Sequence, residues 1–183
     1  MSGYSFFKAL PNLITVGRLF LVPIVVAMIS SHAWGAAFAF FVVAGVSDAA
    51  DGFIAKRYSL TSELGAHLDP IADKALLVSI YVSLAIEGEL PSWITILVVS
   101  RDLMIVGAIL ISWVLDKPVE IRPLLVSKLN TFMQIVLAMA VMAMRAFDLR
   151  LDIVLPALVV TAAALTLASM VAYLAQWLRH MSA

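Results

Sequence analysis

The sequence contains no cysteine, few charged residues and no excess of charge of either sign. The absence of cysteine excludes disulfides, thiolate metal sites and cysteine nucleophiles, and it leaves the redox compartment undetermined. Charged residues make up 13% of the 183 residues, against about a quarter in a typical soluble domain, and hydrophobic residues make up 63%. The formal net charge is zero, so no basic field indicates nucleic-acid binding. This composition predicts a membrane protein with several spans.

Long apolar segments account for most of the chain. A helix that crosses the bilayer needs roughly 20 largely apolar residues. Six segments meet this requirement: 12–31, 34–55, 66–86, 92–115, 124–146 and 152–178. The first could be mistaken for a signal peptide, but Arg18 and Pro23 interrupt its apolar run, so we interpret it as a retained helix. Because no polar linker or internal repeat divides the chain, we predict one domain over residues 1–183, an all-α integral membrane protein with six transmembrane helices.

The loops between these segments differ in their content of basic residues. If the chain alternates from helix to helix, one side receives Lys8, Lys56, Arg57, Lys117, Arg122 and Arg179. The opposite side receives Glu87 and Glu89 in one loop, although Arg145 and Arg150 lie near another. Since basic loops stay on the cytoplasmic side, this distribution predicts that both termini face the cytoplasm or its equivalent, the mitochondrial matrix.

Charged residues inside the predicted helices lie toward the same side. Asp48 and Asp51 come late in the second segment, Asp69 and Asp73 come early in the third, and Arg101 lies near the middle of the fourth. Charged groups at membrane depth are costly and usually line a polar cavity or a functional site. The sequence therefore predicts one polar cavity that opens toward the cytoplasm. The sixth segment, which is rich in alanine, we interpret as a lipid-facing or packing surface.

The spacing of the four aspartates points to metal binding. Asp48 and Asp51 are three residues apart and Asp69 and Asp73 are four apart, so each pair shares one helix face. Four carboxylates in one low-dielectric pocket cannot all stay ionised without cations. Oxygen ligands favour Mg²⁺ or Mn²⁺ over zinc, and two divalent ions would balance four carboxylates. We therefore predict a site for two ions.

Residues 48–73 can be written D-x₂-D-G-x₂-A-K-x₈-G-x₃-D-x₃-D. This pattern resembles the signature of the CDP-alcohol phosphotransferase family, the class I CDP-alcohol phosphatidyltransferases, in which arginine usually stands at the position of Lys56. The resemblance implies an integral membrane enzyme, commonly a homodimer, that uses a CDP-linked donor and releases CMP. The lysine keeps a positive charge but lacks the planar fork with which arginine binds a phosphate through two hydrogen bonds.

The resemblance also implies roles for individual residues. The ligands of the two metal ions would be Asp48, Asp51, Asp69 and Asp73. Asp73, together with Asp69, would be catalytic, with Asp73 the favoured general base. The residues that hold the nucleotide would be Gly52, Ala55 and Lys56, with Arg57 as a substitute for the missing arginine.

Two later stretches, YVSLAIEGELPSWITILVVSRDLMIVGAIL and IRPLLVSKLNTFMQIVLA, resemble the mitochondrial-type cardiolipin synthases of this family. That branch would transfer a phosphatidyl group from CDP-diacylglycerol to phosphatidylglycerol in a bacterial or mitochondrial inner membrane. Related phosphatidylglycerophosphate synthases use glycerol 3-phosphate instead. Cationic Arg101, Arg122 and Lys128 could bind the phosphate of either acceptor. The apolar run after Asp102 favours the diacyl acceptor.

Other interpretations remain open at this point. Arg101 and Asp102 could form a buried ion pair that only orients their helix. Lys128 could equally be an anchor at the membrane interface. An ion or proton transporter also holds carboxylates within the membrane. An intramembrane prenyltransferase pairs aspartates with Mg²⁺, but with another acid spacing, and a lipid-binding scaffold gives no reason for four acids.

Overall fold

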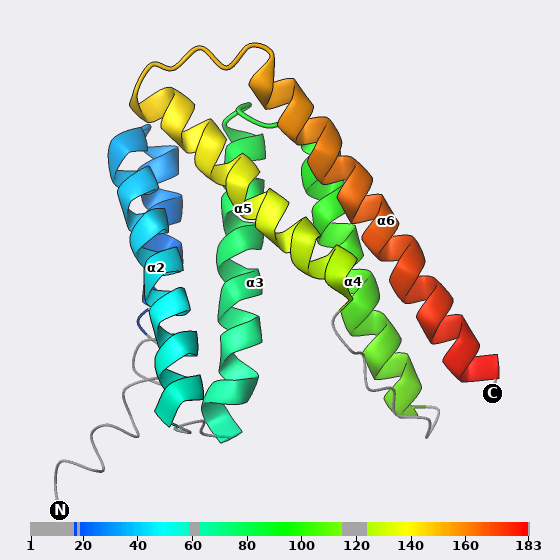
Figure 1. Cartoon of the computed structure of the whole chain (residues 1–183). Helices are drawn as coiled ribbons and strands as arrows, with labels where there is room; N and C mark the ends of the chain where they lie inside the picture. The colour runs from blue at the N-terminus through cyan, green and yellow to red at the C-terminus, as the bar shows by residue number, and fades with distance from the viewer. Residues whose placement is uncertain (1–16, 18, 59–62, 115–123, 183) are drawn as a thin grey trace, which may run out of the picture. The chain divides into compact units, whose positions relative to one another are not determined.

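The computed structural model describes residues 17, 19–58, 63–114 and 124–182, and within these ranges it contains helices and turns and no strand. A first helix covers Leu19–Ser30. It is followed by α2 (Trp34–Tyr58), α3 (Glu63–Ile86), α4 (Ser92–Val114), α5 (Leu125–Ala146) and α6 (Val154–Ser182) (Figure 1). The predicted all-α class is thus confirmed. The predicted segments match these helices closely, although α2 continues past residue 55 and α3 begins before residue 66.

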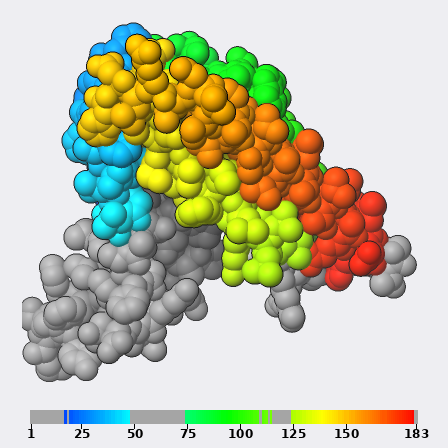
Figure 2. Space-filling view, turned by 45° about the horizontal axis from the view of Figure 1, so that its top comes forward, coloured from blue at the N-terminus to red at the C-terminus, as the bar shows by residue number. Residues whose placement is uncertain are grey.

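Three helices of the described chain are long and apolar enough to cross a membrane: Ser92–Ser112, Leu125–Ala146 and Val154–Met181. The surface of α6, which lies open along its length in Figure 2, carries large exposed apolar side chains, namely Val160, Leu167, Val171, Leu174 and Leu178. An apolar surface of this kind is unfavourable in water and favourable in contact with lipid. These features indicate an integral membrane protein, and the count of six spans stays a prediction.

Helices of the described chain end at residues in the left-handed backbone region. These residues are His32 (φ 56°), Gly88 (φ 75°) and Asp148 (φ 51°). After the first helix, the N–H of Ala33 donates to the carbonyl of Met28 at 2.9 Å, which satisfies a carbonyl that the helix leaves without a partner. Glycine takes this conformation freely, whereas histidine and aspartate take it at a cost.

The chain divides into two compact units, and each is described by itself. The first unit comprises residues 1–87 and 142–149. Its buried residues include Ile29, Phe41, Ile80, Tyr81 and Leu84. The rings of Phe38 and Phe147 meet edge to face with their centroids 5.6 Å apart, so the turn after α5 packs on α2.

The second unit comprises residues 88–141 and 150–183. In this unit α4 and α6 pack side by side, as Figure 1 shows. Its fully buried residues include Ile94, Val98, Leu137 and Ala162. Helix α5 belongs to this unit up to residue 141, and its last turn belongs to the first unit. The prediction of one domain over residues 1–183 stays a prediction.

Candidate active site

The four predicted metal ligands lie on two consecutive helices. Asp48 and Asp51 belong to α2, and Asp69 and Asp73 belong to α3. Both helices are continuous over these positions, so spacings of three and four residues correspond to about one turn. The side chains of all four lie outside the described residues. The structure therefore has the helices on which the predicted acidic faces depend, and the metal site itself stays a prediction.

The predicted nucleotide-binding residues all lie on α2. The predicted nucleotide ligands Gly52, Ala55, Lys56 and Arg57 occupy its last two turns, and their side chains are also outside the described residues. Among the side chains that the structure does describe, no three His, Asp or Glu residues gather in a way that could hold a metal ion. The predicted acidic segment is not part of that set.

Arg101, near the middle of α4, is the centre of a buried polar cluster. Its Nη1 donates to Asp102 Oδ1 at 2.6 Å. Its Nε and Nη2 donate to the hydroxyl oxygen of Ser169 at 3.1 and 2.9 Å, and Nη2 also donates to the hydroxyl of Ser127. The Tyr173 ring lies under the guanidinium, 5.4 Å from its Cζ. We call these five residues the Arg101 cluster.

The cluster joins three helices of the second unit. Arg101 and Asp102 come from α4, Ser127 comes from α5, and Ser169 and Tyr173 come from α6. Only 4% of Arg101 is exposed, and a buried guanidinium is tolerable only where a counter-ion and hydrogen-bond acceptors surround it. The ion pair that we considered for Arg101 and Asp102 is thus present. A role for Arg101 in acceptor binding stays a prediction.

A second buried polar contact lies one turn away along both α5 and α6. The Thr166 hydroxyl on α6 lies 2.8 Å from Asn130 Oδ1 on α5 and donates to the carbonyl of Ala162 at 2.7 Å. Both Asn130 and Thr166 are fully buried. Polar contacts between apolar helices fix which faces meet, because lipid offers an unpaired group no alternative partner.

Sequence reasoning missed the contribution of α6. We interpreted this helix as a lipid-facing or packing surface, whereas one of its faces carries Thr166, Ser169 and Tyr173 inward. These three residues are separated by three and four positions, which is the spacing of one helix face. That stripe of hydroxyl groups in an otherwise apolar helix was the signal that could have identified them.

The remaining predicted acceptor ligands differ in their position. Lys128 lies in the first turn of α5, next to Ser127, and is exposed. Its side chain could therefore reach either an anionic ligand or the membrane interface. Arg122 lies outside the described residues.

Comparison with known proteins identifies the class. The model of the CDP-alcohol phosphatidyltransferase family matches residues 8–178. The chain belongs to this family, so the predicted family is confirmed, and with it the transferase class that the family's name denotes.

Three relatives show which members of the family the chain is similar to. The chain is 31% identical over 163 residues to rat (Rattus norvegicus) "Cardiolipin synthase (CMP-forming)", with 80% of this chain and 54% of the relative covered. It is 31% identical over 155 residues to the human (Homo sapiens) protein of the same name, with 76% and 52% covered. It is 33% identical over 155 residues to "CDP-diacylglycerol--glycerol-3-phosphate 3-phosphatidyltransferase 1, chloroplastic" of rice (Oryza sativa subsp. japonica), with 75% and 47% covered.

These relatives confirm the resemblance to the cardiolipin synthases, but they do not identify the acceptor. The chain spans about half the length of the curated relatives that it matches. Relatives named for the two reactions have nearly the same identity, 31% and 33%. Overall similarity therefore does not separate the two acceptors.

Proposed function

We propose that the chain transfers a phosphatidyl group from CDP-diacylglycerol to a hydroxyl of phosphatidylglycerol, which yields cardiolipin and CMP. The observation that carries this proposal is the complete acidic signature on two consecutive helices of a chain that belongs to the family. The cardiolipin synthases among the relatives and the apolar stretch that follows Asp102 in α4 favour the diacyl acceptor.

The donor set suits two hard divalent cations. Two carboxylates on α2 and two on α3 supply only oxygen ligands, which Mg²⁺ and Mn²⁺ prefer. In this proposal the metal ligands are Asp48, Asp51, Asp69 and Asp73. Bound there, the ions would neutralise the diphosphate and lower the energy of the departing CMP.

The protein's own residues would move the proton and hold the nucleotide. Asp73, supported by Asp69, would accept the proton of the acceptor hydroxyl. The hydroxyl oxygen then forms a bond to the phosphorus that bears diacylglycerol, and the bond from that phosphorus to CMP breaks. Gly52 and Ala55 would let the nucleotide approach α2 closely, and Lys56 or Arg57 would supply a positive charge.

Three cations would attract the phosphodiester of the acceptor. Lys128 is exposed at the start of α5. Arg101 is buried in the same unit, two residues before the apolar stretch that follows Asp102 in α4. Arg122 would be the third. Positive charge on these residues would raise the affinity for an anionic acceptor lipid, either by direct contact with its phosphate or through the electric field.

The proposed setting is a bacterial or mitochondrial inner membrane. The chain would cross it six times as a homodimer, with the active site facing the cytoplasm or matrix. Three helices in the described part of the chain are long and apolar enough to cross a membrane, and together with the asymmetric loop charges they support this arrangement.

An acceptor panel tests the proposal. Purified protein with labelled CDP-diacylglycerol and Mg²⁺ or Mn²⁺ is given phosphatidylglycerol, glycerol 3-phosphate, inositol phosphate or serine in separate reactions. We expect CMP and cardiolipin with phosphatidylglycerol alone. Product with glycerol 3-phosphate alone would replace the proposal by phosphatidylglycerophosphate synthesis, for which the rice relative is named. Ion flux in liposomes without any CMP release would favour a transporter.

A further inference from the structure

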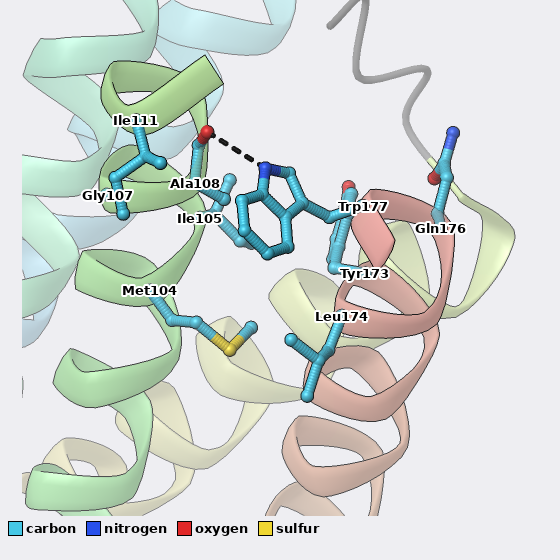
Figure 3. A pocket seen from close by; sticks show the side chains of 9 residues that line it. All are labelled: Met104, Ile105, Gly107, Ala108, Ile111, Tyr173, Leu174, Gln176 and Trp177. Carbon is cyan, nitrogen blue, oxygen red and sulfur yellow. Dashed lines mark hydrogen bonds between the residues drawn. The ribbon is translucent and has the colours of Figure 1, made fainter. Parts of the chain in front are cut away.

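A cavity of about 290 Å³ lies between α4 and α6 in the second unit (Figure 3). Its walls include Met104, Ile105 and Gly107 from α4 and Tyr173, Leu174 and Trp177 from α6. In Figure 3 the side chains of Met104 and Leu174 face each other across the space. The cavity therefore has a largely hydrocarbon lining.

The indole of Trp177 adds little polarity to this lining. Its Nε1 donates to the carbonyl of Ala108 at 3.2 Å and to the hydroxyl of Ser112 at 2.9 Å, so its hydrogen-bonding capacity is already used. The ring presents carbon to the cavity. Buried water needs two to four polar partners, and cavities lined by carbon stay dry, so an apolar occupant suits this space better than water.

The cavity lies next to the Arg101 cluster, in which Asp102 balances the charge of the guanidinium. It begins one turn beyond Arg101 along α4, and Tyr173, which forms part of its wall, lies under the Arg101 guanidinium. An exposed cation, Lys128, follows the Ser127 that binds Arg101, and an occupant with an anionic headgroup and a hydrocarbon chain matches this cation and the apolar space together. Both helices are apolar enough to cross a membrane, where such molecules surround them.

We propose that the cavity between α4 and α6 binds an acyl chain of the phosphatidylglycerol acceptor. This inference rests on the proposed function and deepens it, because glycerol 3-phosphate has no chain to place there. A slender chain fits a space of this size between two helices of one protomer, whereas a further helix does not.

Gly107 belongs to the wall of the cavity and has room for a side chain. A Cβ atom built at Gly107 meets nothing within 4 Å, so Gly107→Leu adds its side chain to open space. Gly35 in α2 has the same freedom and does not line the cavity, so Gly35→Leu is the matched control. Both substitutions replace glycine by a strong helix former; the gain in helix propensity is full at Gly107, inside α4, and smaller at Gly35, in the first turn of α2, so neither variant should weaken its helix.

Binding is measured by the fluorescence of Trp177. A variant that keeps Trp177 as its only tryptophan, made by replacing Trp34, Trp93 and Trp113 with phenylalanine, is titrated in detergent micelles with phosphatidylglycerol whose chains carry bromine, a quencher. We expect saturable quenching that Gly107→Leu reduces at least by half and Gly35→Leu leaves unchanged. Quenching that does not saturate, or that Gly107→Leu leaves unchanged, would overturn the proposal.

Turnover provides a second measurement. We expect Gly107→Leu to raise the apparent KM for long-chain phosphatidylglycerol about fivefold, a modest effect because an acyl chain gains little by exchanging lipid for protein. The KM for CDP-diacylglycerol and for short-chain phosphatidylglycerol should not change. If Gly107→Leu instead abolishes a cross-linked dimer and leaves quenching intact, a second copy occupies the cavity and the proposal is wrong. Saturable, cavity-dependent quenching by a protein without transferase activity would support the lipid site and refute the proposed function.

Discussion

Two groups of charged residues in this chain are built on opposite principles. The aspartates of α2 and α3 are alike in charge and lie within residues 48–73. The Arg101 cluster combines one cation, one anion and neutral hydroxyls from three helices. A set of like charges at membrane depth needs ions from outside the chain, whereas a mixed set can satisfy itself. The proposed role of the first group is therefore to bind ions, whereas the second holds three helices together.

The largest effect is expected in the acidic group. Asp73→Asn removes the proposed proton acceptor and should lower the rate of CMP release about a thousandfold. The unfolding temperature in detergent should stay close to that of the unsubstituted protein. Turnover at the original rate would refute the catalytic assignment.

Substitutions in the Arg101 cluster should lower the stability of the fold. Arg101→Met removes the guanidinium that pairs with the partly buried Asp102 carboxylate and binds Ser127 and Ser169, which should lower the free energy of unfolding by about 3–5 kcal/mol. The double variant Arg101→Met/Asp102→Leu removes both charges and should recover most of this loss in thermal unfolding.

The double variant also separates the two roles considered for Arg101. If Arg101 helps to bind the acceptor, the double variant stays folded but has a raised KM for phosphatidylglycerol. A stable double variant with an unchanged KM would assign the cluster to the fold alone.

A smaller effect is expected from the second polar contact of this unit. Thr166→Val keeps the shape of the side chain and removes its contact with Asn130, which should cost about 1 kcal/mol of unfolding free energy. Thr161 lies on the same helix and is exposed, and its hydroxyl donates only to the carbonyl of Ala157. Thr161→Val should therefore leave the unfolding temperature unchanged, and equal losses in both variants would contradict the role of the buried contact.

The smallest effect concerns the backbone of the first unit. His32→Gly removes the cost of holding a residue with a side chain at φ 56°, but it also adds conformational entropy to the unfolded chain. The free energy of unfolding should therefore rise by only about 0.5 kcal/mol. The 3.6 Å contact of His32 with Glu87 adds little, since the histidine side chain is 66% exposed. Ser31→Gly, next to it, should destabilise the protein, and a gain in both variants would reject this explanation.

The helices and the acidic signature could be predicted because each depends on nearby residues. Apolar runs of about 20 residues indicate spanning helices whatever lies around them. The aspartates follow one another at three- and four-residue spacings within two adjacent helices. The end of α2 and the start of α3 were misjudged by a few residues, because helix ends depend on local backbone contacts that hydropathy does not describe.

The partners of Arg101 could not be predicted in the same way. Ser127 and Ser169 lie 26 and 68 residues away along the chain, and a serine in an apolar helix can equally bond its own backbone, as Ser112 does to Ala108. The cavity beside Tyr173 likewise depends on the side chains of two separate helices.

The amino-acid sequence by itself determined the family, the membrane setting and the acidic signature, since composition and short-range spacing carry all three. Only the tertiary structure decided that Arg101 is held by α5 and α6 and that a cavity opens between α4 and α6. The physical reason is that hydrogen bonds and voids between helices depend on which faces meet, and apolar periodicity alone leaves many such pairings nearly equal in energy.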